Sequence, residues 1–239
     1  MRISQFLFAL CFVALFAHAA VGDKEAYIKK QMQEQFPQQP IKSVSKSPYF
    51  GLYEVVIGTI IVYTDEKANY VFVGNIIDAK TKQSLTEARM QEINKVNVAS
   101  LPLDLAFKSV RGTGKRTLYV FSDPDCPFCK RLEKESLNGV NDVTIYTFLF
   151  PFDIHPDAAR KAALIWCAKD RAQAWNDWMQ NGKLPEDSGK CETPIAKVEA
   201  LASKLGIRGT PGLVFADGRL VPGAIPKDKL EELLSQASK

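Results

Sequence analysis

The spacing of apolar residues predicts a small unit of mixed α and β structure in the first third of the chain. Apolar residues recur every four positions over 23–36, which predicts a helix with one buried side. Residues 50–63 and 69–77 are rich in β-branched and aromatic side chains, which predicts strands, and the polar segment 64–69 predicts the turn between them. A unit of this size has a thin core and is often stabilised by oligomerisation.

A second predicted helix follows this unit. Ser84-Leu85-Thr86-Glu87 has the spacing of a capping box, which predicts a helix start. The apolar positions of this helix are sparse, so we expect it to connect two modules rather than to join a core. Pro102 ends the helix, and we place the domain boundary near residue 100.

Strands and helices alternate from residue 116 onward. Strands are predicted over 117–121, 143–150, 212–216 and 220–221, and helices over 127–137, 156–181, 194–205 and from Pro226. The Asp217-Gly218 pair between two apolar runs predicts a β-hairpin. Alternating strands and helices with a closing hairpin and a terminal helix are typical of an α/β layer fold, in which the long helical segment 156–181 is an insertion.

The first nineteen residues predict an export signal. Arg2 precedes an apolar run over 6–16 that is too short to span a bilayer, and Ala17-His18-Ala19 has the form of a signal-peptidase site. We therefore expect residues 1–19 to be cleaved and the rest of the chain to be exported.

Composition and charge exclude few functions. The hydrophobic content of 46% and the charged content of 24% are ordinary for a soluble globular protein. The net charge is +4, and loss of Arg2 with the signal would lower it by one to +3. This charge is too small, and too evenly spread, to indicate a nucleic-acid partner.

The candidate chemistry lies in Cys126-Pro127-Phe128-Cys129, which follows the strand predicted over 117–121. Pro127 suits the first position of a helix, so Cys126 is expected at a helix N-terminus, where the N–H groups and the helix dipole stabilise a thiolate. Cys129 lies about one helical turn further on, close enough to form a disulfide with Cys126. The motif therefore predicts a redox dithiol in which Cys126 is exposed and attacks, and Cys129 resolves.

Two other interpretations of the pair are less well supported. A zinc site usually adds a second C-x-x-C or a pair of histidines, but Cys167 and Cys191 are far apart in the sequence and His155 is the only histidine beyond the first twenty residues. We therefore expect neither a metal nor another cofactor. A purely structural disulfide between Cys126 and Cys129 would close almost no loop and would stabilise little.

Charged residues of both signs flank the dithiol. Lys130 and Arg131 would lower the pKa of Cys126, whereas Asp123 and Asp125 would oppose them. We assign none of the four a role, because solvated charges on a surface contribute little.

The remaining cysteines allow two arrangements. Loss of the signal removes Cys11 and leaves four cysteines, an even number in an exported protein. If the dithiol pairs internally, Cys167 and Cys191 could form a disulfide that closes a loop of about 25 residues, worth roughly 3–4 kcal/mol. Two free buried thiols are the alternative, and the residues alone leave both open.

The dithiol, the helix after it and the later Gly209-Thr210-Pro211 resemble a thioredoxin-fold oxidoreductase. The resemblance extends further when the export signal, the N-terminal meander, the linker helix, the segment Ile165-Trp166-Cys167-Ala168-Lys169-Asp170 and the downstream Cys191 are added. The whole mature chain then resembles the bacterial periplasmic thiol:disulfide isomerase family DsbC and its close relative DsbG.

This resemblance implies a thioredoxin-like catalytic domain with a helical insertion, preceded by a small α+β dimerisation domain and a linker helix. The expected domains are a signal peptide at 1–19, a dimerisation domain at 20–83, a linker helix and connector at 84–108, and a catalytic domain at 109–239. It also implies a V-shaped homodimer joined through the N-terminal domains, with both dithiols facing an apolar cleft that receives misfolded chains.

The resemblance further implies roles for individual residues and partners. Thr210-Pro211 would form a cis peptide bond packed against the dithiol and would bind substrate, and Cys167 and Cys191 would form a structural disulfide. The implied partners are misfolded, disulfide-containing exported proteins and a membrane thiol reductase of the DsbD type.

One motif departs from the best-known isomerases of this family, which carry Gly-Tyr where this chain has Pro127-Phe128. Proline at the first position also occurs in the periplasmic oxidase DsbA, so the motif is compatible with the reduction potential of an isomerase or of an oxidase. Two alternative functions remain, a DsbG-like chaperone or reductase of oxidised single cysteines, and a disulfide-stapled binding module without turnover.

Overall fold

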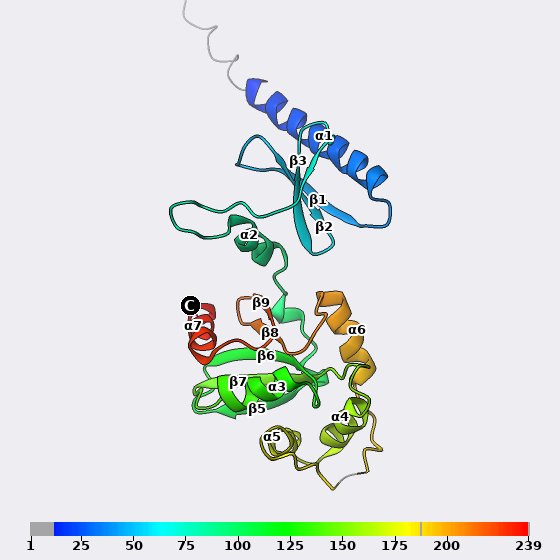
Figure 1. Ribbon diagram of the computed structural model, residues 1–239, viewed down its shortest axis with the longest axis vertical. Helices are drawn as coiled ribbons and strands as arrows, with labels where there is room; N and C mark the ends of the chain where they lie inside the picture. Colours follow the sequence, from blue (N-terminus) through cyan, green and yellow to red (C-terminus); the bar gives the residue numbers. More distant parts are fainter. Residues whose placement is uncertain (1–11, 187, 239) are drawn as a thin grey trace, which may run out of the picture. The chain divides into compact units, whose positions relative to one another are not determined.

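The computed structural model describes residues 12–186 and 188–238, which form two compact units (Figure 1). One unit ends at Ile93 and the other begins at Asn94. The predicted signal peptide, residues 1–19, falls largely on residues 1–11, outside the described part. Helix α1 (Phe12–Gln35) continues without a break through the predicted cleavage site.

The first unit packs α1 against a four-stranded antiparallel sheet with the order β1-β2-β3-β4. The strands are β1 (Ile41–Lys46), β2 (Tyr53–Ile57), β3 (Ile60–Thr64) and β4 (Val71–Phe72). The predicted run 50–63 is thus two strands, because Gly58 and Thr59 form a two-residue hairpin loop in which Gly58 has a φ of 58°. The sequence pattern missed β1, whose residues are mostly polar and only partly buried.

Helix α2 (Leu85–Ile93) packs on the sheet of the first unit, which differs from the expected connector. The buried Thr86 hydroxyl shares a 2.7 Å hydrogen bond with the Tyr63 hydroxyl, and Arg89 forms a 3.1 Å ion pair with Glu54. Successive residues of β2 point to opposite faces, so Val55 packs toward α1 and Val56 toward α2. Both faces of this small sheet are therefore covered.

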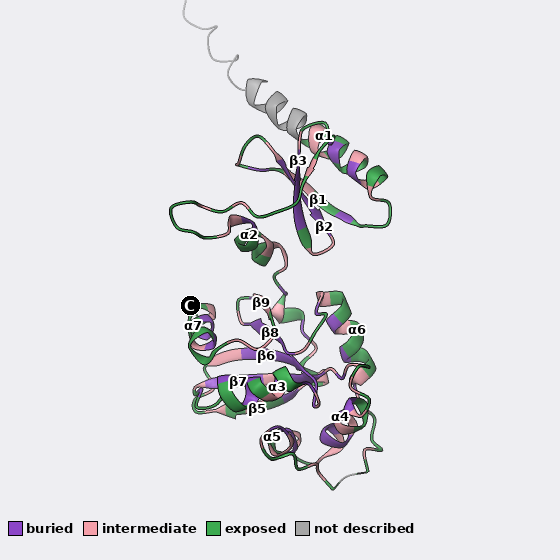
Figure 2. Ribbon diagram, viewed as in Figure 1, coloured by how far each residue is buried: buried purple, intermediate pink, exposed green. Residues whose placement is uncertain are grey.

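The second unit is built on a five-stranded sheet with the order β5-β7-β6-β8-β9. The strands are β5 (Phe107–Arg111), β6 (Arg116–Ser122), β7 (Val143–Leu149), β8 (Gly212–Phe215) and β9 (Leu220–Pro222). β6 and β7 are parallel, and every other pair is antiparallel. Figure 2 shows that the central strands of this sheet are largely buried.

Helices cover both faces of this sheet. The helices are α3 (Pro127–Arg131), α4 (Ala158–Cys167), α5 (Arg171–Asn181), α6 (Ile195–Leu205) and α7 (Lys227–Ala237). Leu118 and Val120 of β6 pack with α7 and the segment after α3, whereas Tyr119 and Phe121 face the buried side of α6. This alternation along β6 fixes which face each helix covers.

Two predicted helices are divided in the structure. The helix predicted over 127–137 begins as α3 and continues as a π-helical turn, Leu132–Ser136. The predicted segment 156–181 is two helices, because the chain becomes extended after Cys167 and Asp170 caps α5 by accepting a hydrogen bond from the N–H of Gln173.

Cys167 and Cys191 are joined by a disulfide that links the end of α4 to the segment before α6. The residues alone left two free thiols open, and the structure contains the bond. The two cysteines lie 24 positions apart in the sequence, and Cys191 is exposed rather than buried. The bridge therefore constrains an exposed connection rather than filling a core.

We expect replacement of both cysteines, Cys167→Ala with Cys191→Ala, to lower the free energy of unfolding by about 3 kcal/mol, because the closed loop restricts the unfolded chain. Urea unfolding of the variant and the parent, both with a reduced dithiol, measures the difference. An unchanged free energy of unfolding would show that the bridge does not stabilise this unit.

Candidate active site

The dithiol lies where β6 leads into α3. Pro127 occupies the first position of α3, and Cys126 is its extended N-cap residue, as the sequence predicted. Both thiols are free but covered: Cys126 exposes 4% of its surface and Cys129 exposes none. The expectation that Cys126 is well exposed is therefore wrong, because both cysteines pack in a core cluster with side chains of α4 and α5.

The loop Thr210-Pro211 lies directly against the dithiol, and its peptide bond is cis. The Thr210 carbonyl oxygen lies 3.3 Å from Cys126 Sγ and accepts a hydrogen bond from this sulfur when Cys126 is protonated. Antiparallel pairing of β8 with β6 places Gly212 opposite Phe121. This pairing brings together two segments that lie 84 positions apart in the sequence.

The two thiols have opposite pKa shifts. The pKa of Cys126 is lowered to about 5, mainly because the Cys129 thiol donates a hydrogen bond to the thiolate. Burial opposes this shift, while the Thr210 side chain and the first N–H groups of α3 add to it. Burial raises the pKa of Cys129, and its hydrogen bond to Cys126 raises it further. At neutral pH, Cys126 is therefore a thiolate and Cys129 a thiol.

Asp123 holds the loop that carries Cys126. Its side chain is completely buried, and Oδ1 accepts hydrogen bonds from the N–H groups of Asp125 at 2.7 Å and Cys126 at 3.1 Å. Oδ2 accepts one from the N–H of Phe152 at 2.7 Å and lies 2.8 Å from His155 Nδ1. The pKa of His155 is raised, chiefly by this hydrogen bond to Asp123. The carboxylate thus connects the dithiol loop to the segment after β7.

The insertion helices hold the same loop from another side. Lys161 of α4 forms a 2.7 Å ion pair with Asp125, and Trp178 of α5 donates from its indole nitrogen to the Pro124 carbonyl at 2.6 Å. Lys161 Nζ also lies 4.7 Å from the centroid of the Trp178 ring, and Lys130 Nζ lies 4.8 Å from it. These contacts pack two cations on the indole beside the dithiol.

Asp123 and Asp125 were interpreted from the sequence as solvated charges, and the structure shows that both are buried or partly buried and bonded. An aspartate three residues before the N-cap of a helix often binds the backbone N–H groups that follow it, so an Asx turn was the available signal for Asp123. His155, Lys161 and Trp178 lie too far away in the sequence to be linked to the dithiol by any local pattern.

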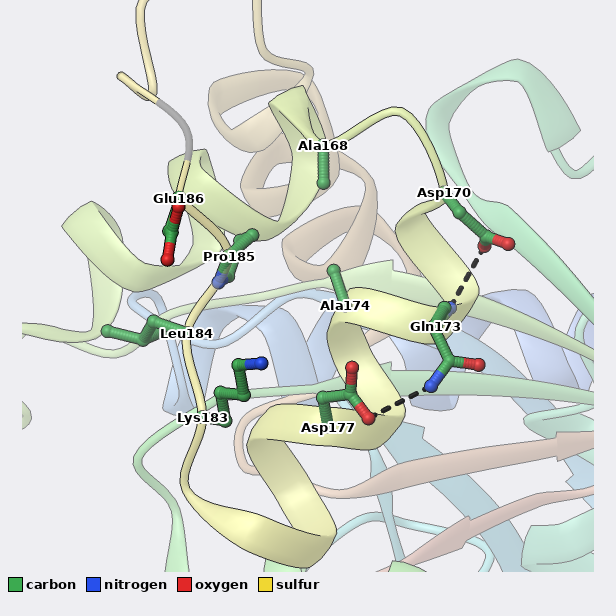
Figure 3. A pocket seen from close by; sticks show the side chains of 9 residues that line it. All are labelled: Ala168, Asp170, Gln173, Ala174, Asp177, Lys183, Leu184, Pro185 and Glu186. Atoms are coloured by element: carbon green, nitrogen blue, oxygen red, sulfur yellow. Dashed lines mark hydrogen bonds between the residues drawn. The ribbon is translucent and has the colours of Figure 1, made fainter.

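A separate hollow lies on the helical insertion, between α5 and residues 183–186 (Figure 3). Its polar side chains bond one another, since the amide of Gln173 donates to Asp177 at 2.9 Å. Neither thiol lines it, so it is not part of the dithiol site. Within residues 12–186 and 188–238, no group of three or more His, Cys, Asp or Glu side chains is placed to hold a metal ion.

Comparison with known proteins gives matches over both units. Residues 103–238 match the family described as "Thioredoxin-like domain", and residues 17–87 match the "Disulfide bond isomerase protein N-terminal domain". A "Probable thiol:disulfide interchange protein DsbC" of Bordetella pertussis is 42% identical over 207 residues, which cover 87% of this chain and 73% of that protein. The "Thiol:disulfide interchange protein DsbC" of Escherichia coli is 26% identical over 231 residues, covering 95% and 94%.

A solved structure also matches more than half of the chain. The crystal structure of a disulfide interchange protein from Neisseria gonorrhoeae is 48% identical and superposes with a TM-score of 0.56, covering 58% of this chain and 99% of that one.

The lowered pKa predicts that alkylation of Cys126 by iodoacetamide has a midpoint near pH 5 in the reduced protein. The rate should be constant above about pH 6 and should fall about tenfold per pH unit below the midpoint, because only the thiolate reacts. The Cys129→Ala variant has no donor at this position, so its midpoint should move to higher pH. A midpoint near pH 8.5, as in free cysteine, would contradict the assignment.

Proposed function

The chain belongs to the DsbC family of thiol:disulfide interchange proteins, as its resemblance predicted, and from this premise we propose that it isomerises and reduces non-native disulfides of exported proteins. As a member of this family it is a thiol-disulfide oxidoreductase with a thioredoxin-like domain. The observation that carries the proposal is a C-x-x-C dithiol in which Cys126 is the N-cap residue of α3 and its sulfur lies 3.3 Å from the Thr210 carbonyl oxygen. The opposite pKa shifts of the two thiols support it.

The proposed reaction is thiol–disulfide exchange. The Cys126 thiolate attacks one sulfur of a substrate disulfide, forms a mixed disulfide and releases the other substrate sulfur as a thiolate. The released thiolate can attack elsewhere in the substrate, which completes an isomerisation and frees Cys126. If it does not, Cys129 attacks Cys126, the substrate leaves reduced, and the dithiol is oxidised. We propose that a membrane thiol reductase of the DsbD type then restores the dithiol.

The surroundings of the dithiol support binding of unfolded chains. Phe128, between the two cysteines, and Ile154, next to His155, expose 52% and 79% of their surfaces. Apolar side chains in such positions can contact the apolar segments that misfolded proteins expose. The loop at Thr210-Pro211 would hold the substrate backbone by edge pairing next to Cys126, which is a common mode of peptide binding. Chaperone-like binding is part of the proposal for this reason.

A homodimer through the first unit is supported by its open sheet edge. β4 pairs with β3 on one side only, and Tyr70, Phe72 and Val73 in and around it are exposed. An apolar edge strand of this kind is a template for pairing with another chain. The match to the isomerase N-terminal domain covers this strand.

We propose the periplasm as the location. The predicted signal would direct export, and disulfides such as Cys167–Cys191 persist in oxidising compartments. Among the helices of the described residues, none is long and apolar enough to cross a bilayer.

We expect Cys126→Ser to abolish exchange and Cys129→Ser to trap mixed disulfides with substrates, because attack then survives without the resolving thiol. Non-reducing gels of both variants after incubation with scrambled ribonuclease give the comparison. The double alanine variant of Cys167 and Cys191 is the control, since it keeps the dithiol. Adducts on Cys126→Ser but not on Cys129→Ser would reverse the two roles.

The two-unit structure predicts that isomerisation and reduction can be separated. A fragment that begins at Asn94 should be monomeric and should still reduce insulin, but should lose most of its isomerase and chaperone activity, because a substrate is no longer held between two sites. A start near residue 100 would remove Val96, which is buried in the second unit and donates from its N–H to Gly218 at 2.8 Å.

A fragment that begins at Ser100 is therefore the matched control, and it should unfold at a lower temperature than the fragment from Asn94. Equal isomerisation of scrambled ribonuclease by the Asn94 fragment and the full protein would show that the first unit has no catalytic purpose. Preferential reduction of sulfenylated single cysteines by the full protein would favour the DsbG-like alternative.

A further inference from the structure

Ser122 is the last residue of β6 and directly precedes the loop that carries the dithiol. Its side chain is completely buried. Among the described residues, its hydroxyl is the one buried side-chain oxygen or nitrogen without a hydrogen-bond partner. Burying a hydroxyl without a partner is unfavourable, so an isolated case in an otherwise satisfied core requires a physical reason.

The backbone that follows this hydroxyl contacts the sulfur of Cys129. The N–H of Asp123, one residue further on, donates to Cys129 Sγ at 3.5 Å. Burial is the main effect on this sulfur and raises its pKa, whereas the Asp123 N–H and the Ser122 side chain both lower the pKa of Cys129. In the reduced protein Cys129 is a neutral thiol. A thiol sulfur is a weak hydrogen-bond acceptor, so the Ser122 hydroxyl gains little by pointing toward it. A thiolate would be a much stronger acceptor.

The nearby cations are paired with other groups. His155 bonds Asp123, and Lys161 bonds Asp125 and Asp157. The side chain of Asp123 already accepts hydrogen bonds from the N–H groups of Asp125, Cys126 and Phe152. Neutral donors from the end of β6 are therefore the groups in position to stabilise a negative charge on Cys129.

We propose that the Ser122 hydroxyl and the Asp123 N–H form a two-donor site for the Cys129 thiolate, and that Ser122 is a further catalytic residue in resolution of the mixed disulfide. This inference rests on the proposed function, in which Cys126 attacks and Cys129 resolves. The hydroxyl has no partner in the dithiol because its partner is the charged sulfur that forms during resolution.

In the step concerned, the Cys129 thiol loses its proton and the thiolate accepts the hydrogen bond from Ser122. The Cys129 sulfur attacks the Cys126 sulfur of the mixed disulfide, and the bond between Cys126 and the substrate breaks. A new Cys126–Cys129 disulfide forms, and the substrate leaves with the electron pair. The departing sulfur takes up one proton, which balances the proton lost by Cys129. The dithiol is oxidised and the substrate sulfur is reduced.

Ellman's reagent, a small aromatic disulfide, separates the two chemical steps in the full protein. Attack by Cys126 releases the first coloured thiolate, and resolution by Cys129 releases the second, so absorbance should rise in two phases. For Ser122→Ala we expect an unchanged first phase and a second phase that is slower by about three- to tenfold. Loss of a hydrogen bond to the charged sulfur should lower the fraction of Cys129 present as thiolate by more than about tenfold. On a logarithmic scale about half of this loss is offset, because a thiolate of higher pKa is more nucleophilic.

Further measurements distinguish this role from a structural one. The pH profile of the second phase should move to higher pH in Ser122→Ala, because the loss of a donor raises the pKa of Cys129. Ser122→Thr keeps a hydroxyl and should restore the second phase to within about twofold. The melting temperature of reduced Ser122→Ala should equal or exceed that of the parent, because an unsatisfied hydroxyl is removed. Ser136→Ala, at a second buried serine, is the control and should change neither phase.

An unchanged second phase in Ser122→Ala would overturn the proposal. So would an equally slow second phase in Ser122→Thr, or a slowing of both phases together with a lower melting temperature, which would indicate a structural role. If the parent protein shows no first phase, the proposed function is wrong, and so is the role of Ser122. A normal first phase and an unaffected second phase would instead remove only the role of Ser122.

Discussion

The buried carboxylate of Asp123 fixes the loop on which the dithiol depends. A charge without solvent is costly unless hydrogen bonds replace the water, and here three backbone N–H groups and the ring of His155 surround it. Two of these N–H groups belong to Asp125 and Cys126, so the carboxylate sets the backbone just before α3. With that backbone fixed, Cys126 is held at the start of α3, and Cys129 follows about one turn later in the same helix. The difference in pKa between the two thiols follows from this placement.

The helical insertion contributes to the same site rather than only adding surface. Lys161 and Trp178 reach the dithiol loop from α4 and α5, and Trp175 donates from its indole to the buried Glu133 at 2.9 Å in the π-helical turn. Burial raises the pKa of Glu133. The insertion thus contacts the segments before and after α3, and the Cys167–Cys191 bridge limits how far the end of α4 can move from the segment before α6.

The sequence predicted those features that depend on local patterns. The dithiol between strand and helix, the Asp217-Gly218 hairpin and the terminal helix were each indicated by a few consecutive residues, and the structure places them as expected. Strands β1 and β5 were missed because they carry polar residues at the sheet edges. The contact of Thr210 with Cys126 spans 84 positions, so it came from the family resemblance and not from any spacing.

The charged residues around the dithiol were the part of the site that the sequence predicted least well. Asp123 and Asp125 looked like surface residues because their partners, His155 and Lys161, are 32 and 36 positions away. The unpaired Ser122 hydroxyl had no signal at all in the sequence, since an absent hydrogen bond appears only when the surroundings are known.

The close approach of Val96 to Gly218 has a mechanical consequence. The Val96 carbonyl oxygen would lie 2.4 Å from a Cβ at position 218, and the φ of 86° at Gly218 also favours glycine. The chain coming from the first unit is therefore pinned to the β8–β9 hairpin as soon as the second unit begins. A side chain at position 218 would therefore separate the first residues of the second unit from the hairpin that directly follows the loop Thr210-Pro211.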